Sequence, residues 1–188
     1  MEDKKLKRRQ EIKLTISDLA FGGRGISKED DLVFFVKDAI PNQDVIAKIS
    51  KIKKNYVEAY SIETIKKSKD QVDPLCEHFE WCGGCTTQQL DYQKQLHFKQ
   101  KQISDILTKI AGEKDLDINP IIGCEQTFFY RNKMEYTFSG VPWYIGDESY
   151  DDVVIGLHVP KRFDKILNIN KCHINHDVFN DILQISKE

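Results

Sequence analysis

The chain has 188 residues, of which 40% are hydrophobic and 31% charged, so it can form ordinary folded cores and a disordered tail is excluded. No run of about 18 apolar residues occurs, and no apolar segment follows the basic start MEDKKLKRRQEIKL, so neither a membrane span nor a signal peptide is supported. We therefore expect a cytoplasmic protein. Reduced thiols in that compartment favour metal binding, catalysis or burial over disulfides for the five cysteines.

Charge is unevenly distributed along the chain. Residues 1–70 hold 16 Lys and Arg against 12 Asp and Glu, whereas residues 71–188 hold 12 against 18. A basic first part joined to an acidic second part suggests a polyanion contact near the N-terminus, although such an excess is equally typical of a solvated surface.

Residues 11–64 alternate apolar and polar side chains with the period of a strand. The apolar positions that we expect to face a core are Ile12, Leu14, Ile16, Val33, Phe35, Val45, Ala47, Ile49, Val57 and Ala59. Turn chemistry separates the runs: FGGRGISKEDD supplies three glycines, and IPNQD supplies Pro41 and Asn42. Residues 1–66 are therefore predicted to form a small closed barrel of the OB type with a basic N-terminal arm, KKLKRR, and residues 67–74 a linker.

The remaining part, residues 75–188, is predicted to be an α+β module. Residues 89–111 have a helical period, with Leu96, Ile103, Leu107 and Ile110 on one stripe, a candidate capping box from Thr86 to Gln89, and Gly112 at the end. Strands return between residues 130 and 174, and the last residues begin another amphipathic helix. The whole chain is thus predicted to be β-rich α+β.

The stretch LCEHFEWCGGCTTQQL carries the most specific chemical signal in the sequence. Cys76 and Cys82 are separated by five residues, and Cys82 and Cys85 by two, a spacing at which a short loop can wrap thiolates around a metal or a cluster. The two glycines allow close approach of the backbone to such a group. A fourth ligand could come from Cys124 or Cys172; we favour Cys172, at the end of a predicted strand. The alternatives are a four-cysteine zinc site and three simply buried thiols.

Taken together, CEHFEWCGGCTTQQLDYQKQLHFKQ, YRNKM and INKCHI resemble the iron–sulfur-containing RNA uracil-5-methyltransferases over essentially the whole chain. The resemblance implies a [4Fe–4S] cluster held by Cys76, Cys82, Cys85 and Cys172, and an N-terminal TRAM barrel that contacts RNA. It implies uridine methylation in ribosomal RNA with S-adenosylmethionine. The radical methylthiotransferases also combine a TRAM barrel with an iron–sulfur centre, but their cysteine spacing and domain order differ.

The S-adenosylmethionine domain of that family has no counterpart here, because only 16 residues follow Cys172 and no Gly-rich strand-to-helix turn occurs among them. We therefore expect the N-terminal portion of such an enzyme, monomeric and inactive alone, with no catalytic or S-adenosylmethionine-binding residue. The alternative is a stand-alone RNA-binding or redox-sensing protein with an iron–sulfur or zinc site.

Cations on a scaffold and exposed aromatic faces are what RNA binding requires. On the predicted barrel the candidate RNA-binding residues are Arg24, Lys48, Lys51, Lys53, Lys54 and Tyr56. In the second module Arg131 and Lys133 would point to the same side of a strand, and the resemblance implies that YRNK lies near the RNA path. A solvated face or salt-bridged pair is the alternative for each.

Overall fold

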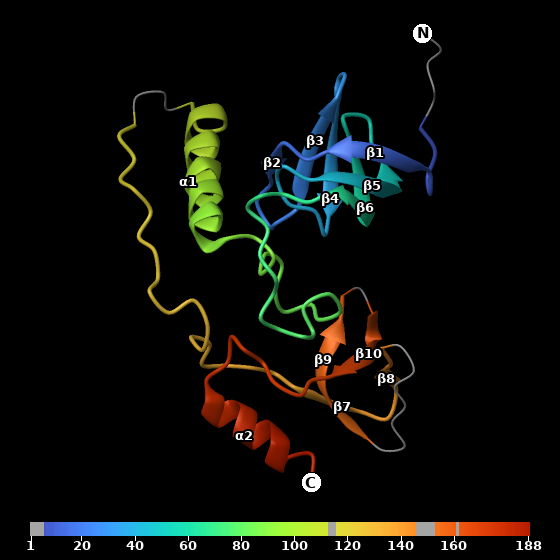
Figure 1. Cartoon of the computed structure of the whole chain (residues 1–188), viewed down its shortest axis with the longest axis vertical. Helices are drawn as coiled ribbons and strands as arrows, with labels where there is room; N and C mark the ends of the chain where they lie inside the picture. The colour runs from blue at the N-terminus through green and yellow to red at the C-terminus, as the bar shows by residue number, and fades with distance from the viewer. Residues whose placement is uncertain (1–5, 113–115, 146–152, 161) are drawn as a thin grey trace. The chain divides into compact units, whose positions relative to one another are not determined.

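The computed structural model describes residues 6–112, 116–145, 153–160 and 162–188, which form two compact units (Figure 1). Unit 1 comprises Met1–Asp73 and Gln89–Ile122, and unit 2 comprises Pro74–Gln88 and Gly123–Glu188. This grouping differs from the predicted one. The linker region and the helix that follows the cysteine loop both belong with the N-terminal strands, so the cysteine loop is an insertion between two parts of unit 1 that contributes to unit 2.

Unit 1 contains a six-stranded sheet. Its strands are β1 (Glu11–Thr15), β2 (Asp18–Leu19), β3 (Gly25–Glu29), β4 (Leu32–Lys37), β5 (Asp44–Ile52) and β6 (Tyr56–Lys66), in the spatial order β1-β5-β6-β4-β3-β2. All neighbours are antiparallel except β4 and β6, which are parallel. The first and last strands of this order, β1 and β2, are separated in the chain by two residues only. The two edge strands of the sheet, β1 and β2, are therefore kept close to each other by this short connection.

The predicted inward positions are confirmed in β1, β5 and β6, where Leu14, Val45, Ala47, Ile49 and Val57 are at most 1% exposed. In β4 the prediction is wrong by one residue. Phe34 and Val36 are buried, whereas Val33 and Phe35 are only half-buried on the opposite face. The run LVFFV is apolar at every position, so its pattern does not distinguish the two faces of the strand.

The glycine-rich stretch and the N-terminal residues are more ordered than predicted. Gly22 and Gly23 take positive φ in a turn, but Gly25 already begins β3, which the sequence analysis treated as part of the loop. The expected basic arm, residues 4–9, is described from Leu6 onward. There Leu6 packs against the core of unit 1, and the Arg9 amide donates to the Ile49 carbonyl at 2.8 Å, so residues 6–9 are held on the sheet.

Helix α1 (Tyr92–Lys109) is close to the predicted range, but its cap and its buried side differ from the prediction. Asp91, not Thr86, caps the helix, and its side chain accepts from the Lys94 amide. The buried residue is Phe98, which packs with Leu19, Ile40 and Leu90 in unit 1. Two members of the predicted apolar stripe are exposed instead, Ile103 by 47% and Ile110 by 80%.

Unit 2 contains β7 (Thr137–Ser139), β8 (Pro142–Trp143), β9 (Val154–Val159) and β10 (Arg162–Asn168), followed by α2 (Asp177–Ile185). The spatial order is β7-β9-β10-β8, with β8 parallel to β10, so the sheet is not a simple meander of hairpins. Its core consists of Ile155, Leu167, Ile169, Cys172, Ile174 and Leu183. None of the helices described has the length and apolar character needed to cross a bilayer.

Candidate metal centre and nucleic-acid interface

The cysteine loop is ordered by short-range backbone bonds. The Phe79 amide donates to the Cys76 carbonyl at 3.1 Å, and the Cys82 amide donates to the His78 carbonyl at 2.8 Å. The Gly84 amide donates to Sγ of Cys82 at 3.3 Å, and Gln88 accepts from the Cys76 amide at 3.3 Å. These bonds hold Cys76, Cys82 and Cys85 in a compact turn structure, and all three line one cavity.

His78 connects the loop to the segment after β10. It is 6% exposed, and its Nε2 accepts a hydrogen bond from the Asn170 amide at 3.1 Å. The Asn170 side chain in turn donates to Glu77 at 3.4 Å. His78 is therefore a structural residue that joins positions about ninety residues apart. This role could not be predicted from the sequence, since the partner of His78 is a backbone group that no residue pattern reveals.

Cys172 lies four residues beyond β10, and helix α2 fixes it from the other side. The buried Asn180 side chain accepts from the Cys172 amide at 2.8 Å and donates to the Cys172 carbonyl at 3.2 Å. Tyr136 packs nearby; burial is the main cause that raises its pKa to about 12, so it stays a neutral phenol. Asn180 and Tyr136 were both missed from sequence, because neither carries a spacing signal.

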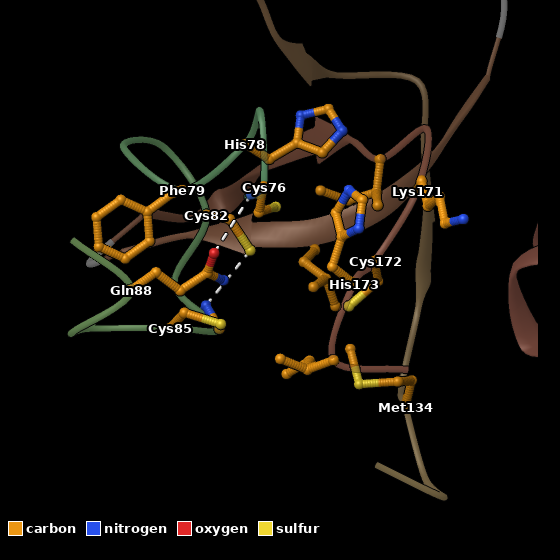
Figure 2. A pocket seen from close by; sticks show the side chains of 14 residues that line it. Cys76, His78, Phe79, Cys82, Cys85, Gln88, Met134, Lys171, Cys172 and His173 are labelled. Atoms are coloured by element: carbon orange, nitrogen blue, oxygen red, sulfur yellow. Dashed lines mark hydrogen bonds between the residues drawn. The ribbon is translucent and has the colours of Figure 1, made fainter. Parts of the chain in front are cut away.

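These contacts bring the four predicted cysteines around one cavity. Figure 2 shows Cys76, Cys82 and Cys85 of the loop bordering the same space as Cys172, and the cavity volume is about 20 Å³. Met134 and Leu157 contribute apolar walls. Burial, followed by the neighbouring thiols, raises the pKa of Cys82 to about 11, and burial also raises the pKa of Cys76 and Cys85. These three loop thiols are therefore protonated at neutral pH until a cation replaces the protons.

The four thiols are donors of the kind that bind zinc or an iron–sulfur cluster, and the structure does not decide between these two expectations. Across the described ranges, no three His, Cys, Asp or Glu side chains are arranged so that they could hold one metal ion. Each thiolate of a four-iron cluster binds its own iron, so the sulfurs need not converge on one point. The Gly84 amide bond to Cys82 is also the kind of N–H···S contact that tunes iron–sulfur sites. The cavity is small, at about 20 Å³.

Cys124, the other fourth-ligand candidate, is not among the residues that line the cavity. It is exposed, and its thiol donates to the Gln126 carbonyl at 3.0 Å. The choice of Cys172 over Cys124 as a fourth ligand stays a prediction.

On unit 1, several predicted RNA-binding residues share the outer face of the sheet. Arg24 and Lys51 both approach Glu58, at 3.6 and 4.0 Å, and Lys48 pairs with Glu11 at 3.5 Å. Lys53 and Lys54 lie in the turn between β5 and β6 and form no ion pair with a described residue. The cations are thus partly neutralised by partly exposed ion pairs, and such pairs are weak enough for phosphate to replace the carboxylate.

The strand register adds residues to this face that the sequence analysis missed. Tyr60 stands between Lys37 of β4 and Lys48 of β5, and directly paired residues share a face of the sheet. Tyr56 packs edge-to-face on Phe35, with ring centroids 5.7 Å apart. The one-residue error in β4 had turned Phe35 inward, and correcting it would have revealed this aromatic surface.

Arg131 and Lys133 do not lie on a strand, contrary to expectation. Arg131 forms only an isolated bridge with Asn175, and its Nε donates to the Lys133 carbonyl at 3.0 Å. Lys133 pairs with Glu135 at 2.8 Å. The two cations nevertheless line one open groove, of about 680 Å³, beside the cysteine loop.

No protein-family model matches the sequence. Three curated proteins, each named an uncharacterized RNA methyltransferase, match most of it. The protein of Bacteroides thetaiotaomicron is 39% identical over 87% of this chain, that of Porphyromonas gingivalis 34% over 93%, and that of Clostridium acetobutylicum 35% over 97%. This chain is similar to one portion of these proteins. It covers 37%, 40% and 38% of their respective lengths, which is less than half.

Among solved structures, the chain is similar in fold to the Pyrococcus abyssi tRNA (uracil-54, C5)-methyltransferase, determined in complex with S-adenosyl-L-homocysteine. The TM-score is 0.57 over 93% of this chain and 35% of that one, with 22% sequence identity. The likeness establishes a shared β-rich α+β arrangement.

Proposed function

We propose that this chain is the RNA-binding and cluster-binding portion of an RNA uracil-5-methyltransferase, with ribosomal RNA as the substrate and S-adenosylmethionine as the methyl donor of the whole enzyme. The observation that carries the proposal is the meeting of Cys76, Cys82 and Cys85 with Cys172 at one cavity, from segments 87 residues apart. The similarity to proteins named RNA methyltransferases supports the activity class.

In this proposal the four thiolates hold a [4Fe–4S] cluster, which supplies a covalent link between the loop and the segment after β10. His78 and Asn180 position the two halves of the ligand set through backbone bonds. Unit 1 is a TRAM-type barrel whose cationic outer face binds phosphate. No residue of this chain is assigned to methyl transfer, so the isolated chain should bind RNA without methylating it. We place the protein in the cytoplasm as a monomer.

The cluster assignment is tested by anaerobic reconstitution of the chain, followed by iron and zinc analysis. We expect about four irons per chain, retained by Cys124→Ser and lost by Cys172→Ser. Iron retained by Cys172→Ser and lost by Cys124→Ser would identify Cys124 as the fourth ligand. One zinc per chain with no iron would establish a zinc site instead.

The RNA assignment is tested by fluorescence anisotropy with a labelled ribosomal RNA hairpin at several salt concentrations. We expect salt-dependent binding, because each phosphate contact releases counterions. Transfer RNA serves as the competing probe, since the structural neighbour acts on tRNA. Preferential binding of tRNA would overturn the ribosomal assignment, and absence of binding to either RNA would overturn the RNA-binding function.

A further inference from the structure

The open groove in unit 2 is separate from the cysteine cavity but adjoins it. It is lined by residues 131–135, by Gly83 and Gly84 of the cysteine loop, and by Leu157 and His158 of β9. Gly84, Met134 and Leu157 line both spaces, so these residues form the wall between them. At about 680 Å³ the groove falls within the size range of small-ligand clefts, which run from about 300 to about 1,000 Å³.

One side of the groove carries cations that a phosphate could engage. The bond from Nε of Arg131 to the Lys133 carbonyl uses one of five guanidinium donors and fixes the orientation of the group. The Lys133 and Glu135 side chains are 83% and 81% exposed, so their pair is weak and Lys133 can exchange Glu135 for another anion. This side is therefore suited to a phosphate that accepts from Arg131 and Lys133 together.

The β9 side carries aromatic rings. His158 lines the groove, and its ring centroid lies 6.3 Å from that of Phe163 in an edge-to-face pair. Phe163, on β10, is not itself among the residues that line the groove, but it is 87% exposed next to His158, so its ring is open to a ligand. Rings of this kind offer faces on which an unpaired base can stack, whereas bases in a duplex are already stacked on one another.

We propose, building on the RNA-binding function above, that this groove is a subsite for one unpaired nucleotide of single-stranded RNA. Arg131 and Lys133 bind its phosphate, and the His158–Phe163 pair stacks on its base. The cysteine loop then has a second role, because its two glycines form part of the groove wall.

The test measures binding of the whole chain to a short single-stranded RNA and to the same RNA annealed to its complement. Phe163→Ala should weaken single-strand binding by roughly fivefold or more, because stacking of one base is worth about that much, and should leave duplex binding unchanged. Phe138→Ala is the matched control, since Phe138 is also an exposed phenylalanine of unit 2, at 63%, whereas Phe163 is the one whose ring pairs with His158 of the groove wall.

The cationic side is tested with Lys133→Gln, which should reduce the slope of log K against log salt by about 0.7 for single-stranded RNA. Lys109→Gln, which removes an ion-paired lysine from α1 in unit 1, should not change it. If the wild type binds RNA and neither Phe163→Ala nor Lys133→Gln weakens that binding, the groove is not a nucleotide subsite. The proposed RNA-binding function would be unaffected by that result. Absence of wild-type binding would overturn that function itself. Far-UV circular dichroism confirms that each variant is folded.

Discussion

Gly156, at the centre of the unit 2 sheet, is the residue with the least room for a side chain. It pairs with Thr137 on one side and Asn168 on the other. A Cβ at this position would collide with the Leu167 carbonyl oxygen, and it would lie 2.8 Å from the Leu167 carbonyl carbon and 3.1 Å from the Ile169 nitrogen. These are backbone atoms of the β10 region that leads to Cys172, so they cannot rotate away.

We therefore expect Gly156→Ala to lower the free energy of unfolding of unit 2 by more than about 3 kcal/mol, at the upper end of overpacking effects. Denaturant unfolding monitored by tryptophan fluorescence would measure it, since both tryptophans, Trp81 and Trp143, belong to unit 2. Gly140→Ala is the control, because a Cβ there meets no atom within 4 Å, and its effect should stay within about 0.5 kcal/mol. Equal stability of the two variants would contradict the close backbone contact between β9 and β10.

Asn180 is the residue whose loss should most directly displace Cys172. In Asn180→Ala, the buried amide and carbonyl of Cys172 lose their partners, which costs about 1 to 3 kcal/mol for each unsatisfied group. We expect lower stability of the metal-free chain and less iron per chain after reconstitution. Asp181→Ala, an exposed change on the same helix, is the control. Full iron content in Asn180→Ala would show that Cys172 does not need the two hydrogen bonds from Asn180 to bind iron.

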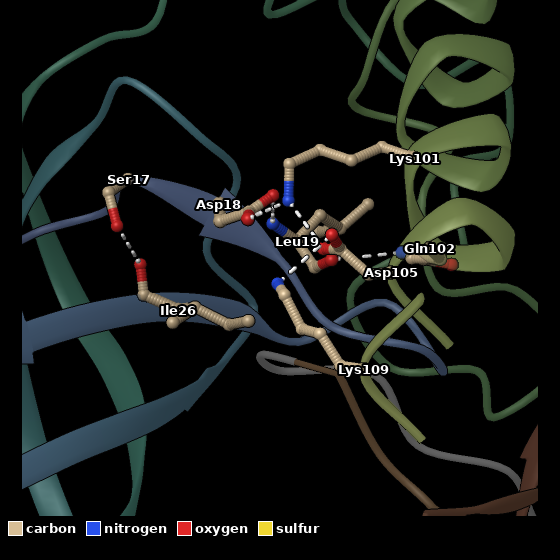
Figure 3. Close-up of polar contacts among 8 residues, drawn as sticks. All are labelled: Ser17, Asp18, Leu19, Ile26, Lys101, Gln102, Asp105 and Lys109. Atoms are coloured by element: carbon tan, nitrogen blue, oxygen red, sulfur yellow. Dashed lines mark hydrogen bonds and ion pairs between the residues drawn. The ribbon is translucent and has the colours of Figure 1, made fainter. Parts of the chain in front are cut away.

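At the scale of elements, helix α1 is attached to unit 1 by a side that its sequence pattern does not reveal. The Lys101 ammonium lies between Asp18 of β2, at 2.6 Å, and Asp105, at 2.9 Å, and the Gln102 side chain donates to the Leu19 carbonyl at 2.9 Å (Figure 3). The hydrogen bond with Asp18 is the main cause that raises the pKa of Lys101. These polar contacts thus lie near Phe98, the one residue of α1 that is buried.

We expect Phe98→Ala to destabilise unit 1 by about 3 kcal/mol, as large-to-small changes of buried phenylalanine do. Ile103→Ala should cost less than about 1 kcal/mol, because Ile103 is 47% exposed although it belongs to the predicted stripe. Far-UV circular dichroism against denaturant distinguishes the two. A larger loss in Ile103→Ala would mean that α1 packs through the stripe the sequence predicted.

The strands that alternate strictly could be predicted from sequence, and those with uniform or mixed patterns could not. VIAKI in β5 has one apolar face, so its register followed directly, whereas LVFFV in β4 is apolar on both faces. Spacing singled out Cys76, Cys82 and Cys85, whereas Cys172 was added because it ends a predicted strand; that the four act as ligands stays a prediction, although all four line one cavity. His78 and Asn180 were not, because their partners are backbone groups brought close only by folding. Arg131 was predicted to lie on a strand, because the local sequence does not show that regular strand pairing begins only at β7.

At the scale of the whole molecule, the charge asymmetry of the sequence has a physical basis in the structure. The basic first part forms the outer face of the unit 1 sheet, where Arg24, Lys48 and Lys51 each approach a carboxylate. Lys53 and Lys54 lie in the adjacent turn without such partners among the described residues. Phosphate should therefore bind first to Lys53 and Lys54, since no ion pair with a described residue has to be broken at these two lysines.

Replacing Lys51, Lys53 and Lys54 together by Gln should flatten the slope of log K against log salt by about two units for single-stranded RNA, since each phosphate contact contributes about 0.7. The matched control replaces Lys66, Lys67 and Lys69, which removes the same charge from the same unit. Iron content should be unchanged in both, because all six lysines lie in unit 1 and the cysteines in unit 2. If the two triple variants flattened the slope equally, RNA binding would reflect overall charge rather than the sheet face. An unchanged slope in the first variant would instead confine the phosphate contacts to other cations, with Arg131 and Lys133 the next to replace.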